Sequence, residues 1–351
     1  MALKKGSHAY WRKRFQLLEE AQNKKGLQCC AEIERHYRRA QKEIEGKIAA
    51  WRQRFAVNNG ISMQQAAILL HGRELAEFQW DVQDYIRHGK ENALDQRWMK
   101  ELENASARYH ISRLEALKLH LQQSLEAMTG NILDSLDTAM RDIYKSGYYR
   151  TAYEIQKGIG VGWEFAALDE RTVSKVIKTP WAPDGQNFSE RVWGDRRKLV
   201  YELSQTLTQN IILGQDPQKA VNTIAKKMNT SKSNAGRLVM TEKAFFSSAA
   251  QGDCFQELGV EQYEIVATLD SKTSPLCRQM DGQRLPMAKY EAGVTAPPFH
   301  VWCRSTTVPY IDDDTGPAGL RAARGKNGKT YYVPADTTYR EWERMAGTGA
   351  A

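Results

Sequence analysis

The chain has 351 residues, 26% of them charged and 41% hydrophobic, which is enough to bury cores in two or three domains. No run reaches the roughly 20 apolar residues of a membrane span, and the basic N-terminus lacks an apolar segment, so we expect neither a membrane contact nor a secretory signal. The net charge of +8 fits non-specific contact with a polyanion such as DNA.

Five cysteines, of which Cys29 and Cys30 are adjacent, do not form the spaced pattern of a disulfide framework. Reduced thiols in a cytoplasm are the better interpretation.

The first 157 residues have the periodicity of amphipathic helices. Upstream of Gly26 a shorter helix is expected, and downstream of it a longer one, whose apolar residues recur at steps of three and four. These residues are Ile33, Tyr37, Ala40, Ile44, Ile48, Trp51 and Phe55. We expect Trp51 and Phe55 to bind a partner, because a thin bundle leaves apolar surface for another chain to cover.

Further helices are expected from Ser62 to about Gly89 and over residues 91–128. Gly130-Asn131 is predicted to end the latter, with Asn131 capping another helix that runs to about Lys157. Residues 1–157 are therefore predicted to form an elongated helical arm or bundle.

Residues 158–187 are predicted to be a linker. Gly158, Gly160 and Gly162 indicate a flexible joint, because neither a preceding strand nor the Lys-Ser/Thr pair of a phosphate-binding loop is present. A short helix is expected at 168–178.

Residues 188–311 are predicted to form a compact domain. Helices are expected over 188–213, from Asp216-Pro217 to about Met228, and from Ser231 or Ser233 to Leu258. A β-type run at 263–269, a hairpin turn at Asp281-Gly282 and an extended piece near 306–310 predict a small antiparallel sheet. The fold class is α+β, predominantly α.

Residues 312–351 change in composition. A run of three aspartates and a Gly-rich basic stretch at 316–328 are typical of a linker. Aromatic residues return between Tyr331 and Met345 and suggest a short C-terminal docking segment.

Cys277, His300 and Cys303 are candidate metal ligands. The spacing H-x-x-C suits two adjacent zinc ligands, and Cys277 can supply a third. A C-x-x-C pair would need a cysteine at position 274, where the sequence has Ser274. We favour the other interpretation, in which no cofactor is bound, both cysteines are small buried hydrophobic residues and His300 is hydrogen-bonded in the core.

Four charged residues are assigned structural roles. Asp270 is expected to cap a turn and Asp281 to serve the hairpin. Arg304 is expected to pair with an acidic residue, first of all Glu242, because a buried guanidinium needs a carboxylate. The same carboxylates could gather as a metal nuclease, and Cys303 or Cys277 with His300 has the residue types of a nucleophile pair. No base orienter or oxyanion hole is evident, so we assign no catalytic residue and predict no enzyme.

Short motifs occur in a characteristic order along the chain: Thr241-Glu242, Ala267-Thr268-Leu269-Asp270, Thr273-Ser274, Cys277, Asp281-Gly282, Pro297-Pro298, His300 and Cys303-Arg304. This ordered set resembles the phage Mu F-like family of minor head, or head morphogenesis, proteins of tailed phages. The resemblance covers roughly residues 190–310. Ser274 corresponds to the variant found in phages of Gram-positive hosts, in which serine replaces the first cysteine of the C-x-x-C pair.

The resemblance implies a structural minor capsid protein of the virion. It would bind the portal protein and other head proteins inside the phage head, act in head morphogenesis and in DNA packaging or ejection, and occupy the host cytoplasm during assembly. The alternative is an enzyme, a nuclease or Cys-His hydrolase, delivered with the genome.

Overall fold

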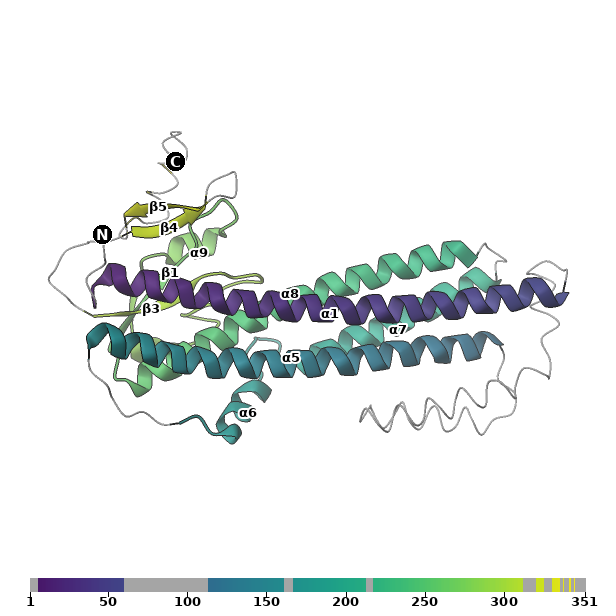
Figure 1. The fold of residues 1–351 in the computed structure, drawn as a ribbon, viewed down its shortest axis with the longest axis horizontal. Helices are drawn as coiled ribbons and strands as arrows, with labels where there is room; N and C mark the ends of the chain where they lie inside the picture. The colour runs from purple at the N-terminus through teal and green to yellow at the C-terminus, as the bar shows by residue number, and fades with distance from the viewer. Residues whose placement is uncertain are drawn as a thin grey trace. The chain divides into compact units, whose positions relative to one another are not determined.

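The structure is a computed structural model that describes residues 6–59, 113–160, 167–212, 217–311, 320–324 and 330–334, with residues 337, 341 and 344. Helices dominate these residues, and a small antiparallel sheet accompanies them (Figure 1), so the predicted α+β, predominantly α class is confirmed. The side chains of Trp51 and Phe55 lie outside the described residues, although their backbone is helical.

Long helices are separated by short elements along the chain. The helices are α1 (His8–Asn59), α5 (Arg113–Ile159), α6 (Glu170–Lys178), α7 (Phe188–Ile212), α8 (Pro217–Glu257), α9 (Pro275–Met280) and the 3₁₀ turn η1 (Met287–Lys289). The strands are β1 (Gln262–Val266), β2 (Arg284–Pro286), β3 (Thr306–Tyr310), β4 (Leu320–Arg324) and β5 (Thr330–Pro334). In this part of the chain no helix is long and apolar enough to cross a membrane.

Three predicted helix breaks are wrong. Helix α1 continues through Gly26, α5 through Gly130, and α8 through residues 229–233. A glycine inside a helix costs only about 1 kcal/mol relative to alanine, and tertiary packing readily offsets that cost. At Gly26 a Cβ atom would lie 3.0 Å from Met240 Sδ and 3.1 Å from Lys243 Cγ, so this glycine allows a close approach to α8.

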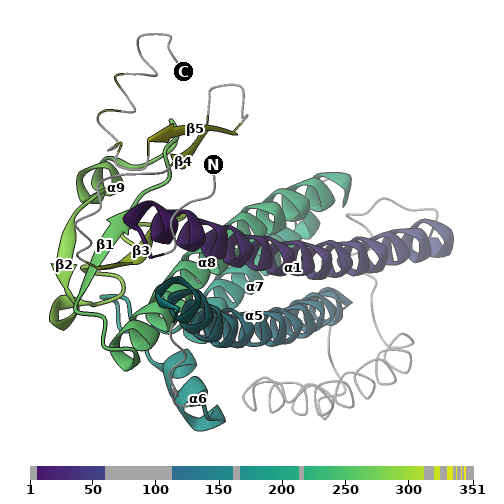
Figure 2. The same cartoon turned by 60° about the vertical axis from the view of Figure 1, so that its left-hand side comes forward.

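The main sheet has the order β2-β1-β3, and both pairings are antiparallel (Figure 2). The predicted hairpin turn at Asp281-Gly282 is wrong, because the short helix α9 lies between β1 and β2 and ends at this turn. Gln283 N donates to Met280 O across the turn at 3.1 Å, and Gly282 has φ +79°, a conformation that favours glycine.

Strands β4 and β5 form a separate antiparallel pair, with Leu320 opposite Pro334 and Arg324 opposite Thr330. β4 falls within the stretch that composition alone assigned to a linker.

Two compact units divide the chain, and neither is a consecutive stretch. The first comprises Met1–Cys30, Leu136–Asn187 and Arg237–Ala351, and the second comprises Ala31–Ser135 and Phe188–Gly236. These units differ from the consecutive boundaries at residues 157 and 188 that the sequence suggested, and α1, α5 and α8 each contribute residues to both.

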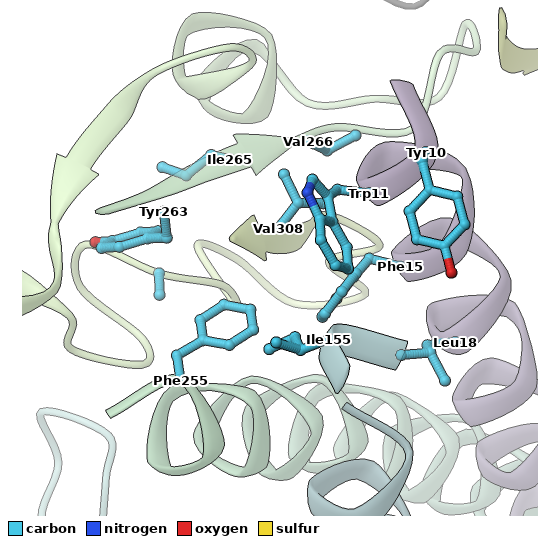
Figure 3. Packing of buried hydrophobic residues seen from close by; sticks show 11 residues of the cluster. Tyr10, Trp11, Phe15, Leu18, Ile155, Phe255, Tyr263, Ile265, Val266 and Val308 are labelled. Atoms are coloured by element: carbon cyan, nitrogen blue, oxygen red, sulfur yellow. The ribbon is translucent and has the colours of Figure 1, made fainter. Parts of the chain in front are cut away.

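The core of the first unit joins the start of α1 to the sheet (Figure 3). Trp11 and Phe15 are almost completely buried and belong to one cluster with Phe255 of α8 and Val308 of β3. Phe15 and Phe255 have ring centroids 5.6 Å apart. The aromatic rings at the start of α1 thus cover the sheet and are part of its hydrophobic core.

Gly158 belongs to this core and not to a flexible joint. It lies in the last turn of α5, and a Cβ atom there would collide with the indole ring of Trp11. The helix ends just after it, where Gly160 has φ +79° and donates its N–H to Gln156 O at 2.8 Å.

The second unit confirms the predicted apolar stripes. The residues of α1, α5 and α7 that recur at helical spacing are buried: Ile33, Tyr37, Ala40, Ile44, Ile48, Leu117, Leu121, Leu125, Met128, Leu199, Leu203 and Leu207. Tyr37 and Ser231 join their hydroxyl groups at 2.7 Å inside this core, which satisfies two buried polar groups.

Candidate metal centre

Helix α9 places Cys277 on a short, capped helix. Ser274 is its N-cap and accepts a hydrogen bond from Cys277 N at 3.2 Å, and Pro275 occupies the first helical turn. Position 274, where a C-x-x-C pair would have its first cysteine, is therefore used as a helix cap.

A tight turn places His300 and Cys303 before β3. Cys303 N donates to His300 O at 3.2 Å, and Trp302 adopts φ +64°, which is uncommon for a bulky side chain. This strained turn brings the two side chains to the same side of the loop, and such strain persists only where the surroundings hold it.

The three side chains converge as the sequence predicted. Cys277 Sγ lies 3.1 Å from His300 Nε2 and 3.7 Å from Cys303 Sγ, and all three potential ligand atoms lie within 4.8 Å of one another. Both cysteine residues are 2% exposed, whereas His300 is half-buried. Among the described residues, this is the one group of three or more His, Cys, Asp or Glu side chains with metal-binding spacing.

A backbone carbonyl fixes the orientation of His300. Its Nδ1 lies 2.7 Å from Val301 O, and a carbonyl can only accept, so Nδ1 carries the proton. In the neutral ring, Nε2 then has a free lone pair and faces the two sulfurs.

The two thiols differ in acidity. Cys277 hydrogen-bonds to Cys303, which raises the pKa of Cys277, with burial adding to the rise. The same hydrogen bond holds the pKa of Cys303 well below its usual range, in opposition to burial. The bond to Cys303 also raises the pKa of His300. Cys303 is therefore the more acidic of the two thiols.

Arg304 pairs with Asp270, and the predicted pairing with Glu242 is wrong. Arg304 Nη1 and Nη2 lie 2.5 Å and 2.8 Å from the two carboxylate oxygens of Asp270, a bidentate arrangement. The register explains it, because Val266 pairs with Thr306 and the chain flanking that pair carries Asp270 and Arg304. Asp270 also accepts from Lys272 N at 2.9 Å, as expected for a turn cap.

The other two carboxylates have separate partners. Glu242 accepts a hydrogen bond from Trp181 Nε1 at 2.8 Å, and Asp281 accepts one from Ala267 N at 2.8 Å. With Asp270 bound to Arg304, these three acids do not form the carboxylate cluster that a metal nuclease needs.

Sequence reasoning did not find the supporting contacts of the centre. The left-handed conformation of Trp302 and the carbonyl of Val301 have no signal in the sequence, since both depend on backbone geometry. The cap at Ser274 had one, because Ser-Pro followed by a short apolar run is typical of a helix start.

The family comparison agrees with the motif set. The model of a family described as Phage Mu protein F like protein matches residues 201–308, which confirms the resemblance. The match covers α8, the main sheet as far as Val308 in β3, and the Cys277, His300 and Cys303 centre. The match indicates a protein of phage head morphogenesis. No curated protein and no solved structure matched the chain.

Proposed function

We propose that the chain is a structural minor head protein of a tailed phage, bound to the portal protein and to neighbouring head proteins inside the head. The observation that carries the proposal is the match of residues 201–308 to the phage Mu protein F-like family. Within the virion it would assist head assembly and the packaging or ejection of DNA, and during assembly it would occupy the host cytoplasm.

The charge of the chain supports this location. A net charge of +8 favours loose contact with packaged DNA, which needs no specific site because phosphate contacts are largely independent of sequence.

An enzymatic role has two observations in its favour, the 3.1 Å approach of Cys277 to His300 and the lowered pKa of Cys303. Three features oppose it. The Cys277 thiol has a raised pKa, both sulfur-bearing residues are almost fully buried, and the neighbouring carboxylates are held elsewhere. A catalytic cysteine needs an exposed thiolate, so we favour the structural role.

Co-expression of this chain with the portal protein of the same phage tests the proposal. We expect both proteins to co-elute in size-exclusion chromatography and to appear together in purified heads. The double variant Trp51→Asp/Phe55→Asp should reduce incorporation if this part of α1 contacts the partner.

The matched control is Arg39→Asp, a charge change at an exposed position of the same helix whose side chain lies beside Glu43. Circular dichroism separates loss of binding from loss of folding. Normal heads from a phage that lacks this chain, with no portal complex in solution, would refute the proposal.

A further inference from the structure

Two segments distant in sequence are joined at the centre of Cys277, His300 and Cys303 without any covalent bond. None of the five cysteines forms a disulfide, and the two sulfurs of the centre are 3.7 Å apart, far beyond the bonding distance of about 2.05 Å. Two thiols and an imidazole therefore lie together in a mostly buried place. Burying such groups costs free energy unless each one has a binding partner.

The separation of the sulfurs matches the edge of a zinc tetrahedron. With Zn–S bonds of about 2.3 Å, two thiolates on one zinc ion lie about 3.8 Å apart, and a thiolate and an imidazole nitrogen lie about 3.5 Å apart. The 3.7 Å between Cys277 Sγ and Cys303 Sγ fits the first value, and the 3.1 Å between Cys277 Sγ and His300 Nε2 is shorter than the second by a few tenths of an ångström.

The surroundings are those of a metal-ligating histidine. Such a histidine donates its other ring N–H to a carbonyl or carboxylate, which selects the tautomer and aims the lone pair. His300 does this with Val301 O at 2.7 Å, so Nε2 is left as an acceptor that faces two sulfurs. This arrangement is an observation independent of the cysteine spacing.

We propose that Cys277, His300 and Cys303 bind one zinc ion, with a water molecule as the fourth ligand. Two thiolates and one imidazole are the donors that this borderline-soft ion prefers over magnesium or calcium. The fourth protein ligand is absent because Ser274 caps α9. Water reaches the ion beside half-buried His300, next to the exposed Val301 and Trp302.

The bound ion would link α9 to the turn before β3 through its bonds to Cys277, His300 and Cys303. Cys277 belongs to the connection between β1 and β2, and His300 and Cys303 belong to the segment that leads into β3. A zinc ion therefore does here what a disulfide would do, and it does so in a reducing cytoplasm where a disulfide does not persist.

Metal analysis of the purified full chain tests the site. The chain is produced in zinc-containing medium, dialysed against metal-free buffer with a phosphine reductant, and measured by inductively coupled plasma mass spectrometry. We expect about one zinc ion per chain. Cys303→Ser and His300→Ala should lower this content at least tenfold, because a site left with two protein ligands holds zinc poorly.

Cys254→Ser is the matched control. Cys254 is also a free, buried cysteine, but it lies on α8 away from the centre, so this variant should retain its zinc.

Two measurements on the unmodified chain keep the test decisive if a variant fails to fold. Cobalt(II) added to the metal-free protein should give the strong visible bands of tetrahedral coordination and a thiolate-to-cobalt charge-transfer band. Zinc should protect Cys277 and Cys303, but not Cys30, from alkylation. A chain without zinc or cobalt bands, or one with a disulfide between Cys277 and Cys303 under these conditions, would overturn the proposal.

Discussion

At the scale of single residues, the paired charges of Asp270 and Arg304 are the most consequential contact that the sequence analysis misassigned. The carboxylate is buried, and the guanidinium covers both of its oxygens. Removing one partner of such a pair leaves the other without compensation, and that loss weighs more than the net contribution of the intact pair.

Arg304→Ala should lower the free energy of unfolding by about 2–3 kcal/mol, below the roughly 3–5 kcal/mol of a fully buried pair, because Arg304 is itself only half-buried. Urea unfolding followed by circular dichroism measures the change. Arg39→Ala, which removes an exposed arginine paired with Glu43 on one helix, should cost less than about 0.5 kcal/mol. Equal effects of the two substitutions would contradict the assignment.

The same pair predicts a dependence on pH. Burial alone would raise the pKa of Asp270, but the hydrogen bonds and charge of Arg304 lower it below its ordinary value. A carboxylate with a lowered folded-state pKa stabilises the protein above the unfolded-state pKa of about 3.9 and loses this contribution as the pH falls through the folded-state value. The stability difference between the unmodified chain and Arg304→Ala should therefore be full near pH 7 and shrink below about pH 4.

At the scale of elements, two glycines show that side-chain packing and helix propensity can have opposite effects on stability. Gly46 and Gly158 both lie in long helices, but a Cβ atom at Gly46 would meet nothing within 4 Å, whereas one at Gly158 would meet the ring of buried Trp11. The two sites should respond to alanine in opposite directions.

Gly46→Ala should stabilise the chain by about 0.5–1 kcal/mol, because alanine has the higher helix propensity. Gly158→Ala should destabilise it by about 1–3 kcal/mol, because a rigid indole has to move in a packed core. Thermal unfolding of both variants measures the contrast. If Gly158→Ala were as stable as Gly46→Ala, the packing of α5 on Trp11 would be incorrect.

Much of this architecture could be predicted from the spacing of apolar residues, because that spacing depends only on residues close together in the sequence. The stripe from Ile33 to Ile48 and the β-type run that contains Tyr263 and Ile265 both report which side chains are buried. Helix ends were less predictable, since Gly26 and Gly130 cost little against tertiary packing.

The candidate site also has one part that the sequence predicts and one part that it does not. Residue types and the H-x-x-C spacing were enough to predict that Cys277, His300 and Cys303 lie close together. The partner of Arg304 was not predictable, because it depends on the register of β1 against β3, and register is set by pairing across about 40 residues.

At the scale of the whole molecule, the first helix is part of the sheet's support. Trp11 and Phe15 fill the core over β1 and β3. Buried Glu264 on β1 accepts from Arg12 Nε at 2.8 Å and contacts His8 Nε2 at 2.6 Å, and buried Lys243 of α8 pairs with Glu19. Without α1, an apolar surface would be exposed, Lys243 would lose Glu19, and Glu264 would keep Arg284, whose Nε lies 3.4 Å from its carboxylate.

A fragment of residues 188–311 should therefore fail to fold on its own, although the consecutive boundaries suggested by the sequence treat it as a domain. Loss of the aromatic cover and of the α1 partners of Glu264 and Lys243 removes several kcal/mol, a large part of the roughly 5–15 kcal/mol that stabilises a typical domain. The fragment should have helical circular dichroism but no cooperative thermal transition.

The full chain with a protease site inserted between residues 160 and 167 is the matched control, because cleavage keeps α1 and α5 present. Its two pieces should co-elute and unfold together, since α1 and α5 contribute Trp11, Phe15 and Ile155 to the core of the first unit. A cooperative transition of the isolated fragment at the melting temperature of the full chain would contradict this prediction and support the consecutive boundaries.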